Sequence, residues 1–282
     1  MSAMADPALA SPIPILRLSS SLRRRLDESP LLAGRVHSVF EQCLNVQWRD
    51  ESLLALHGPG PLAAPFAASL SVLPGWRSLG PGTAVWNHGG RLRVGPLLID
   101  TGTGASVDCS VPPSADGPEA LAEWLSQFPH DPCAPALSSA TGRLARERLA
   151  AGIRHDDASA FLAGARPLIG LGEGLTPAGD DCLVGALAAL WRFAPYRISR
   201  QPAVRQDLAR AASTGTTTVA REFILHALDG RFSELVIALL TARSPEEARR
   251  ASTRLVGTGA TSGADTLAGL RLALQPLSAA RP

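Results

Sequence analysis

The chain has 282 residues, of which 45% are hydrophobic and 18% charged, with a formal net charge of +2. This composition is typical of a globular protein, and so balanced a charge argues against a nucleic-acid or membrane surface. All 27 basic residues are arginine, which excludes both a Schiff-base lysine and a P-loop lysine.

The cysteines and apolar runs exclude further classes of protein. Four cysteines stand at positions 43, 109, 133 and 182, with no C-x-x-C pair and no histidine cluster at metal spacing. Neither a zinc site nor a disulfide framework is therefore expected. Residues 1–14 lack the pattern of a signal peptide, and the apolar runs are too short to cross a bilayer. We expect a cytoplasmic protein with no nucleic-acid or membrane partner.

The first half of the chain predicts a β-rich module. Residues 1–29 are expected to form a flexible tail, loose to about residue 18, and a short helix at about 20–27. Over residues 30–112, short β-type runs alternate with Gly, Pro and Asn, which indicates a compact, mostly antiparallel sheet or barrel. The expected strands are 36–40, 43–48, 53–57, 69–72, 83–87, 91–94 and 96–100. His88-Gly89-Gly90 is expected to form a hairpin turn.

His37-Ser38 lies in this module and invites a comparison with nucleophilic catalysis. Adjacent residues on a strand face opposite sides, and no Gly-x-Ser-x-Gly elbow presents a serine, so we do not expect a nucleophile here. We expect His37 to line a pocket between the two halves of the protein.

The second half predicts helices. Residues 113–137 are expected to form a Pro-rich joint with one helix, and residues 138–276 a helical domain. The expected helices lie near 139–152, 156–164, 177–193, 202–213, 216–229, 232–242, 245–256 and 263–274. Arg143 and Arg146 are expected to be solvated. The fold class is then α+β, with an N-terminal antiparallel β-rich module packed on a C-terminal all-helical bundle.

Residues 170–185 read GLGEGLTPAGDDCLVG and form the most informative motif. Glycines at that density leave backbone amides accessible. Thr176 is expected to cap a helix that begins at Pro177 and runs to about Phe193. The first turn of such a helix offers free N–H groups, against which a phosphate or carboxylate could sit.

The same pattern returns near the other end of the chain. Gly179-x-Asp181-x-Leu183-x-Gly185 aligns with Gly263-x-Asp265-x-Leu267-x-Gly269. Each Asp lies one helical turn before its Gly on one face, so the two helices can pack closely through the glycines. We expect Asp181 and Asp265 to converge on one pocket. The alternative is that the glycines serve only packing and the aspartates only cap.

Together these motifs give a set of candidate site residues. Thr216-Thr217 precede a helix, where they either cap it or reach a bound anion. The candidate catalytic residues are Asp180, Asp181 and Asp265; the alternative is that they hold a divalent cation such as Mg²⁺. The candidate substrate-binding residues are Gly172, Gly174, Thr176, Gly179, Thr216, Thr217, Ser262, Gly263 and His37.

These residues resemble the AllH-type family over about residues 30–275. The resemblance is carried by GLGEGLTPAGDD, the helix at Thr216-Thr217, GATSGADTLAG, and His37-Ser38-Val39-Phe40 with Asn45. It implies one subunit of an oxamate carbamoyltransferase, which exchanges a carbamoyl group between oxalurate and phosphate in allantoin or purine breakdown. The implied partners are a small anionic substrate, an FdrA-like subunit and a third subunit.

The residues fit this chemistry without requiring it. Carbamoyl transfer passes through a tetrahedral intermediate whose oxyanion needs preorganised donors, and Asp181 or Asp265 could orient the carbamoyl amino group. Glu173 departs from the family pattern and adds negative charge, which favours a cation at that loop. Two alternatives stay open: a non-catalytic subunit or sensor that binds a small anion, and a metal-dependent enzyme acting on a phosphorylated small molecule.

Overall fold

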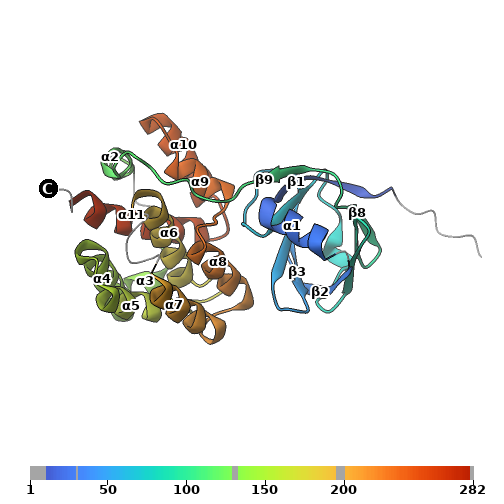
Figure 1. Ribbon diagram of the computed structural model, residues 1–282, viewed down its shortest axis with the longest axis horizontal. Helices are drawn as coiled ribbons and strands as arrows, with labels where there is room; N and C mark the ends of the chain where they lie inside the picture. The colour runs from blue at the N-terminus through green and yellow to red at the C-terminus, as the bar shows by residue number, and fades with distance from the viewer. Residues whose placement is uncertain (1–10, 30, 129–132, 195–200, 280–282) are drawn as a thin grey trace, which may run out of the picture. The chain divides into compact units, whose positions relative to one another are not determined.

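The computed structural model describes residues 11–29, 31–128, 133–194 and 201–279. The chain divides into two compact units, residues 1–108 and 109–282. Each unit has a hydrophobic core of its own, and the two cores share no residue. Figure 1 shows the strands of the first unit and the helices of the second.

The first unit is a mixed β-barrel with one helix. Its elements are β1 (Ile13–Ser19), α1 (Ser20–Glu28), β2 (Leu31–Val39), β3 (Cys43–Trp48), β4 (Leu53–His57), β5 (Ala67–Leu70), the 3₁₀ turn η1 (Trp76–Ser78), β6 (Ala84–His88), β7 (Arg91–Val94), β8 (Leu97–Asp100) and β9 (Ala105–Val107). The strand order is β5-β4-β3-β2-β6-β7-β8-β1, and a β5–β1 pairing closes these eight strands. β9 adds to β1 in parallel.

The barrel begins earlier than the sequence predicted. Residues up to 18 were expected to be loose, but Ile13–Ser19 form β1, with Ile15 and Leu18 buried in the core. This strand pairs in parallel with β8 and β9 and antiparallel with β5. The expected strands at 43–48, 53–57 and 91–94 are confirmed, as is the turn at Gly89-Gly90, where both glycines have positive φ.

The second unit is helical, which confirms the α+β fold class. Its elements are α2 (Glu119–Ser126), α3 (Pro135–Ser138), α4 (Ala140–His155), α5 (Ala158–Ala165), the 3₁₀ turn η2 (Arg166–Leu168), α6 (Ala178–Phe193), α7 (Pro202–Gly215), α8 (Thr218–Leu228), α9 (Glu234–Leu240), α10 (Pro245–Val256) and α11 (Ser262–Ala279). No helix in the ranges that the structure describes is long and apolar enough to span a membrane.

Helix α6 is the centre of this unit. Every residue from Ala178 to Leu190 is buried, because α11, α8 and α9 pack around it. A helix that is apolar on all sides is stable only when it is enclosed in this way. The two aspartates of its first turn, Asp180 and Asp181, are therefore buried inside the unit.

The repeated glycines bring α6 and α11 into backbone contact. A Cβ atom on Gly185 would overlap the carbonyl oxygen of Thr266, and one on Gly269 would overlap that of Cys182. Cys182 and Thr266 each stand three residues before their own helix's glycine. The two helices therefore contact each other through equivalent positions of the repeat, as the spacing predicted.

Candidate functional site

The start of α6 differs in detail from the prediction. The helix begins at Ala178, and Pro177 occupies the cap position without a side-chain cap bond, so the prediction of Thr176 as the cap is wrong. The N–H of Gly179 donates to the Leu171 carbonyl at 2.8 Å, and those of Asp180 and Asp181 donate to the Pro177 carbonyl. These first-turn donors are already engaged, which weakens the expectation of an anion held by them.

The glycine loop before α6 is built for close backbone approach at one end and is open at the other. Gly170 has φ of 75°, and a Cβ atom there would overlap the Gly215 carbonyl. Gly172 and Gly174 are exposed with positive φ, and nothing lies within 4 Å of a Cβ atom on Gly174. Gly170 thus joins the loop to the end of α7, whereas Gly174 is free to approach another molecule.

Asp180 ties this loop to Thr216. One carboxylate oxygen accepts from the Gly170 N–H at 3.0 Å, and the other accepts from the Thr216 hydroxyl at 2.5 Å. Burial raises the pKa of Asp180 to about 6, and these two hydrogen bonds oppose the rise. Both oxygens are engaged inside the protein, so Asp180 has a structural task that its sequence position did not reveal.

Thr217 also has a structural task. Its hydroxyl donates to the Leu175 carbonyl and accepts from the Ala220 N–H, which caps α8. The capping alternative for this residue is confirmed. Gly179 and Gly263 both allow close packing against backbone. A Cβ atom on Gly179 would overlap the carbonyl oxygen of Leu168, and one on Gly263 would overlap that of Leu255.

Asp181 and Asp265 are buried and close enough to interact electrostatically, whereas the one pocket that they were expected to share stays a prediction. Their side chains come from the first turns of α6 and α11, and they are 6% and 0% exposed. Burial raises the pKa of Asp181 well above its usual value, and the charge of Asp265 raises it further. The hydroxyls of Ser262 and Thr176 lie near enough to oppose this rise.

Each carboxyl group of this pair has one unsatisfied oxygen. The Ala134 N–H donates to Oδ1 of Asp265 at 2.9 Å. The Oδ2 atoms of Asp181 and Asp265 are buried and accept no hydrogen bond from the residues described. Burial raises the pKa of Asp265 as well. Because unpaired buried carboxylate oxygens are costly, one on each of two interacting carboxyl groups indicates a retained proton or a place for a polar group.

A cavity of about 200 Å³ adjoins the peptide that carries Asp265. Its lining is Cys133, Arg146, Ala264, Leu267, Ala268, Arg271, Leu272 and Gln275. Arg146 reaches it from α4, and its charge acts on Cys182, the residue after Asp181. Arg271 is positioned by donating to the Leu125 carbonyl at 3.0 Å. Two guanidinium groups in one small cavity suit a carboxylate or phosphate.

His37 lies in the other unit, on β2. A register irregularity between Val36 and Ser38 places both polar side chains together, with His37 Nδ1 3.1 Å from Ser38 Oγ. The Asn45 amide donates to Ser38 Oγ at 3.0 Å. The expectation that His37 and Ser38 face opposite sides is therefore wrong, because a bulge interrupts the alternation. The expected pocket between the two halves stays a prediction.

The metal alternative gains no donor set from the structure. Across the described ranges, no group of three or more His, Cys, Asp or Glu side chains is placed to hold a metal ion. The two oxygens of Asp180 are engaged elsewhere, which leaves only Asp181 and Asp265. A divalent cation at the aspartates stays a prediction.

Two models of known protein families match the sequence of this chain. One model, the AllH family N-terminal domain, matches residues 14–107. Another, described as oxamate carbamoyltransferase subunit AllH, matches residues 168–274. The chain belongs to the AllH family. The first match runs from β1 to the end of β9, and the second includes Asp181 and Asp265 with their glycines. The family is named as a subunit, which implies that other carbamoyltransferase subunits exist. No solved structure matches this AllH-family chain.

Two residues of the site were missed from the sequence. Arg146 was expected to be solvated, yet it is half-buried and lines the cavity, and Arg271 drew no attention in its long apolar helix. Helical spacing alone does not tell a half-buried arginine from a solvated one. The available signal was an arginine on the same face of α11 as the buried Leu267, one helical turn away.

Proposed function

We propose that this chain supplies substrate-binding and catalytic groups to an oxamate carbamoyltransferase that moves a carbamoyl group between oxalurate and phosphate in purine breakdown. The observation that carries the proposal is the cavity of Arg146 and Arg271, whose lining includes Ala264, the residue before Asp265. The description of the matched family supports the choice of this reaction, and the cavity offers a place for an anionic substrate.

The reaction requires that phosphate and the oxalurate carboxylate are held in fixed positions relative to the carbamoyl group that is transferred. A phosphate oxygen attacks the carbamoyl carbon of oxalurate, the bond from that carbon to the oxamate nitrogen breaks, and the nitrogen takes up a proton. The products are carbamoyl phosphate and oxamate. The Nε atom of Arg146 is buried and has no hydrogen-bond partner among the described residues, so it is available for the carboxylate or phosphate.

The aspartate pair suits the carbamoyl group. With its pKa raised by burial, one carboxyl can keep a proton while the other is ionised, as in paired carboxylates that share a site. The pair then offers a donor to the carbamoyl oxygen and an acceptor to its amino group. The two unpaired Oδ2 atoms are the groups that would make these bonds.

The test is carbamoyl phosphate formation from oxalurate and phosphate by the chain assembled with its partner subunits. Arg146→Gln should raise KM for the anion about tenfold or more, because a charge-assisted hydrogen bond is worth roughly 1.5–3 kcal/mol. Asp181→Asn should lower kcat at least a hundredfold with little change in KM. Arg143→Gln is the matched control, since Arg143 is exposed on the same helix and should have no effect.

The outcomes separate this proposal from a subunit that only binds an anion. If Asp181→Asn leaves turnover intact while Arg146→Gln weakens binding, the chain is a binding or sensor subunit. Unchanged kinetics in both variants would place the active site in another subunit.

A further inference from the structure

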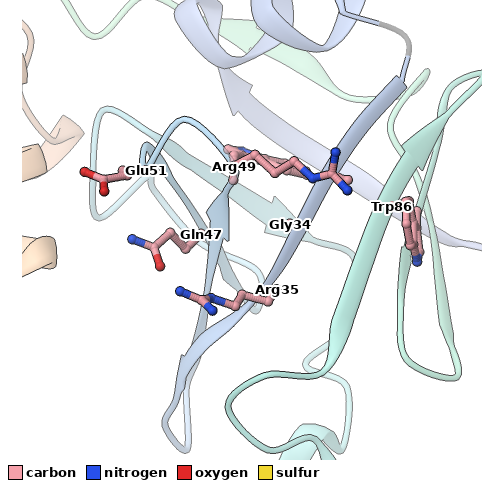
Figure 2. Close-up of a pocket in the computed structure, with 8 residues that line it drawn as sticks. Gly34, Arg35, Gln47, Arg49, Glu51 and Trp86 are labelled. Carbon is pink, nitrogen blue, oxygen red and sulfur yellow. The ribbon is translucent and has the colours of Figure 1, made fainter.

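A second cavity lies in the barrel and is independent of the aspartates. It measures about 440 Å³ and is lined by Ala33, Gly34, Arg35, Gln47, Trp48, Arg49, Glu51 and Trp86. These residues come from β2, from β6, and from β3 with the turn that follows it. The volume falls within the range of pockets that bind small molecules. Figure 2 shows the side chains that surround it.

Two small residues of β2, Ala33 and Gly34, line the cavity. In the register of the sheet, Ala33 is opposite Trp86 on β6, and Gly34 is opposite Trp48 on β3. A Cβ atom on Gly34 would lie 2.9 Å from the Trp48 ring and 2.5 Å from the Gln47 carbonyl oxygen. The buried Trp48 ring therefore occupies the place of a Gly34 side chain, and the open space of the cavity adjoins Ala33 and the exposed Arg35 and Trp86.

The rim of this cavity is basic. Arg35 is opposite Gln47, and Figure 2 shows their side chains pointing to the same side. In Figure 2 the Arg49 side chain points towards β2. Both arginines are exposed, and neither guanidinium has a carboxylate partner in the described part of the chain. Arg25 of α1, by contrast, is paired with Asp50 at 2.6 Å.

The one acidic residue of the lining, Glu51, lies away from the Arg49 guanidinium. Figure 2 shows the Glu51 carboxylate at the opposite end of the cavity from the Arg49 guanidinium. On the far side, Trp86 leaves 54% of its surface exposed on β6. An exposed tryptophan beside unpaired arginines offers a flat apolar face and charged donors to one ligand.

We propose that this cavity is a second ligand site of the chain, which binds a small molecule with a phosphate or carboxylate group attached to a flat ring. The anionic group binds Arg35 and Arg49, Gln47 adds a hydrogen bond, and the ring lies against Trp86. The site does not depend on carbamoyl transfer, because its residues and the aspartates belong to different units.

The test is equilibrium binding to the full chain, measured by calorimetry and by tryptophan emission. Adenosine 5′-monophosphate probes a ring with phosphate, and benzoate probes a ring with carboxylate; whichever binds identifies the anion. Inorganic phosphate alone and adenosine alone should bind at least tenfold more weakly than the adenosine 5′-monophosphate that joins them. We expect one saturable site per chain.

Variants assign the binding to this cavity. Arg49→Gln and Arg35→Gln should each weaken binding about tenfold or more, and Trp86→Phe should remove the change in emission while keeping most of the affinity. Arg91→Gln, which changes an exposed arginine on β7 outside the lining, should bind as the wild type does. The proposal fails if neither ring compound binds saturably at millimolar concentration, or if the Arg35 and Arg49 variants, folded by circular dichroism, bind unchanged.

Discussion

Asp180 and Asp181 are neighbours in the sequence but have different partners in the structure. Asp180 accepts hydrogen bonds from Gly170 and Thr216, whereas Asp181 faces the first turn of α11. Successive residues of a helix point about 100° apart, so one turn can serve two purposes. The first carboxylate holds the loop, and the second joins the buried pair.

The raised pKa of Asp180 predicts that the free energy of unfolding decreases as pH rises. Burial raises this pKa from 3.8 to about 6, so the folded state binds the proton more tightly than the unfolded state. The contribution to the free energy of unfolding is therefore present below pH 3.8 and is lost as pH rises to about 6. Two pKa units correspond to roughly 3 kcal/mol. Asp180→Asn should reduce this fall, as measured by urea unfolding at pH 4 to 7.

The asparagine variant is the informative one because it keeps the shape. The amide oxygen of the new asparagine can accept a hydrogen bond from the Gly170 N–H. Its NH₂ group can donate to the Thr216 hydroxyl, which then accepts a hydrogen bond where it donates one to Asp180. Asp180→Ala, which removes both hydrogen bonds, should destabilise the protein at every pH. An unchanged slope in Asp180→Asn would mean that the pH dependence comes from other groups.

Side-chain contacts could be predicted where a sequence motif is repeated, but not where they depend on a bulge or on the packing of distant helices. The approach of Asp181 to Asp265 was expected from the repeated Gly-x-Asp-x-Leu-x-Gly pattern, and the two carboxyl groups do interact. The contact of His37 with Ser38 required a bulge that no periodicity announces. The cavity role of Arg146 required knowing that α11 covers its face of α4, which is a long-range fact.

At the scale of elements, glycine sets how closely α6 and α11 approach. Gly185 meets the Thr266 backbone and Gly269 meets the Cys182 backbone. Backbone atoms cannot swing aside as a flexible side chain can, so a methyl group at either position would push the helices apart. That separation would also move Asp181 from Asp265.

We therefore predict that Gly185→Ala and Gly269→Ala each lower the free energy of unfolding by about 3 kcal/mol or more, since overpacking against backbone exceeds the usual range. The measurement is urea unfolding followed by circular dichroism. Gly257→Ala is the matched control, because Gly257 has φ of −69° and its nearest neighbours to a Cβ atom lie at 3.6 Å. Equal stability of the three variants would show that α6 and α11 can repack around the methyl group.

The elements that local pattern predicted well were those whose partners are close in sequence. β6 and β7 form a hairpin, and the strands of β3 and β4 are separated by a short turn. β1 was missed because its partners β5, β8 and β9 lie 50 or more residues away, and its own sequence begins with prolines at 12 and 14. Such a strand is stabilised by pairings that only the complete barrel provides.

At the scale of the whole molecule, two separate cores imply two regions of local stability. The barrel core includes Leu92 and the helical core includes Leu187, and both side chains are fully buried. The AllH family matches divide in the same way, one over the barrel and one over the helices. Each unit buries enough apolar surface to form a cooperative region of its own.

We predict that a cavity made in one core affects mainly the unit that contains it. Leu92→Ala and Leu187→Ala should each cost about 2–5 kcal/mol, the usual range for a buried leucine. Amide hydrogen exchange resolves where that loss occurs, because protection reports the local free energy of opening. Leu92→Ala should speed exchange in β2, β6 and β7 and leave α6 and α11 protected, and Leu187→Ala should do the reverse. Faster exchange in both units from either substitution would show that they unfold as one, and binding at the barrel cavity could then alter the aspartate site.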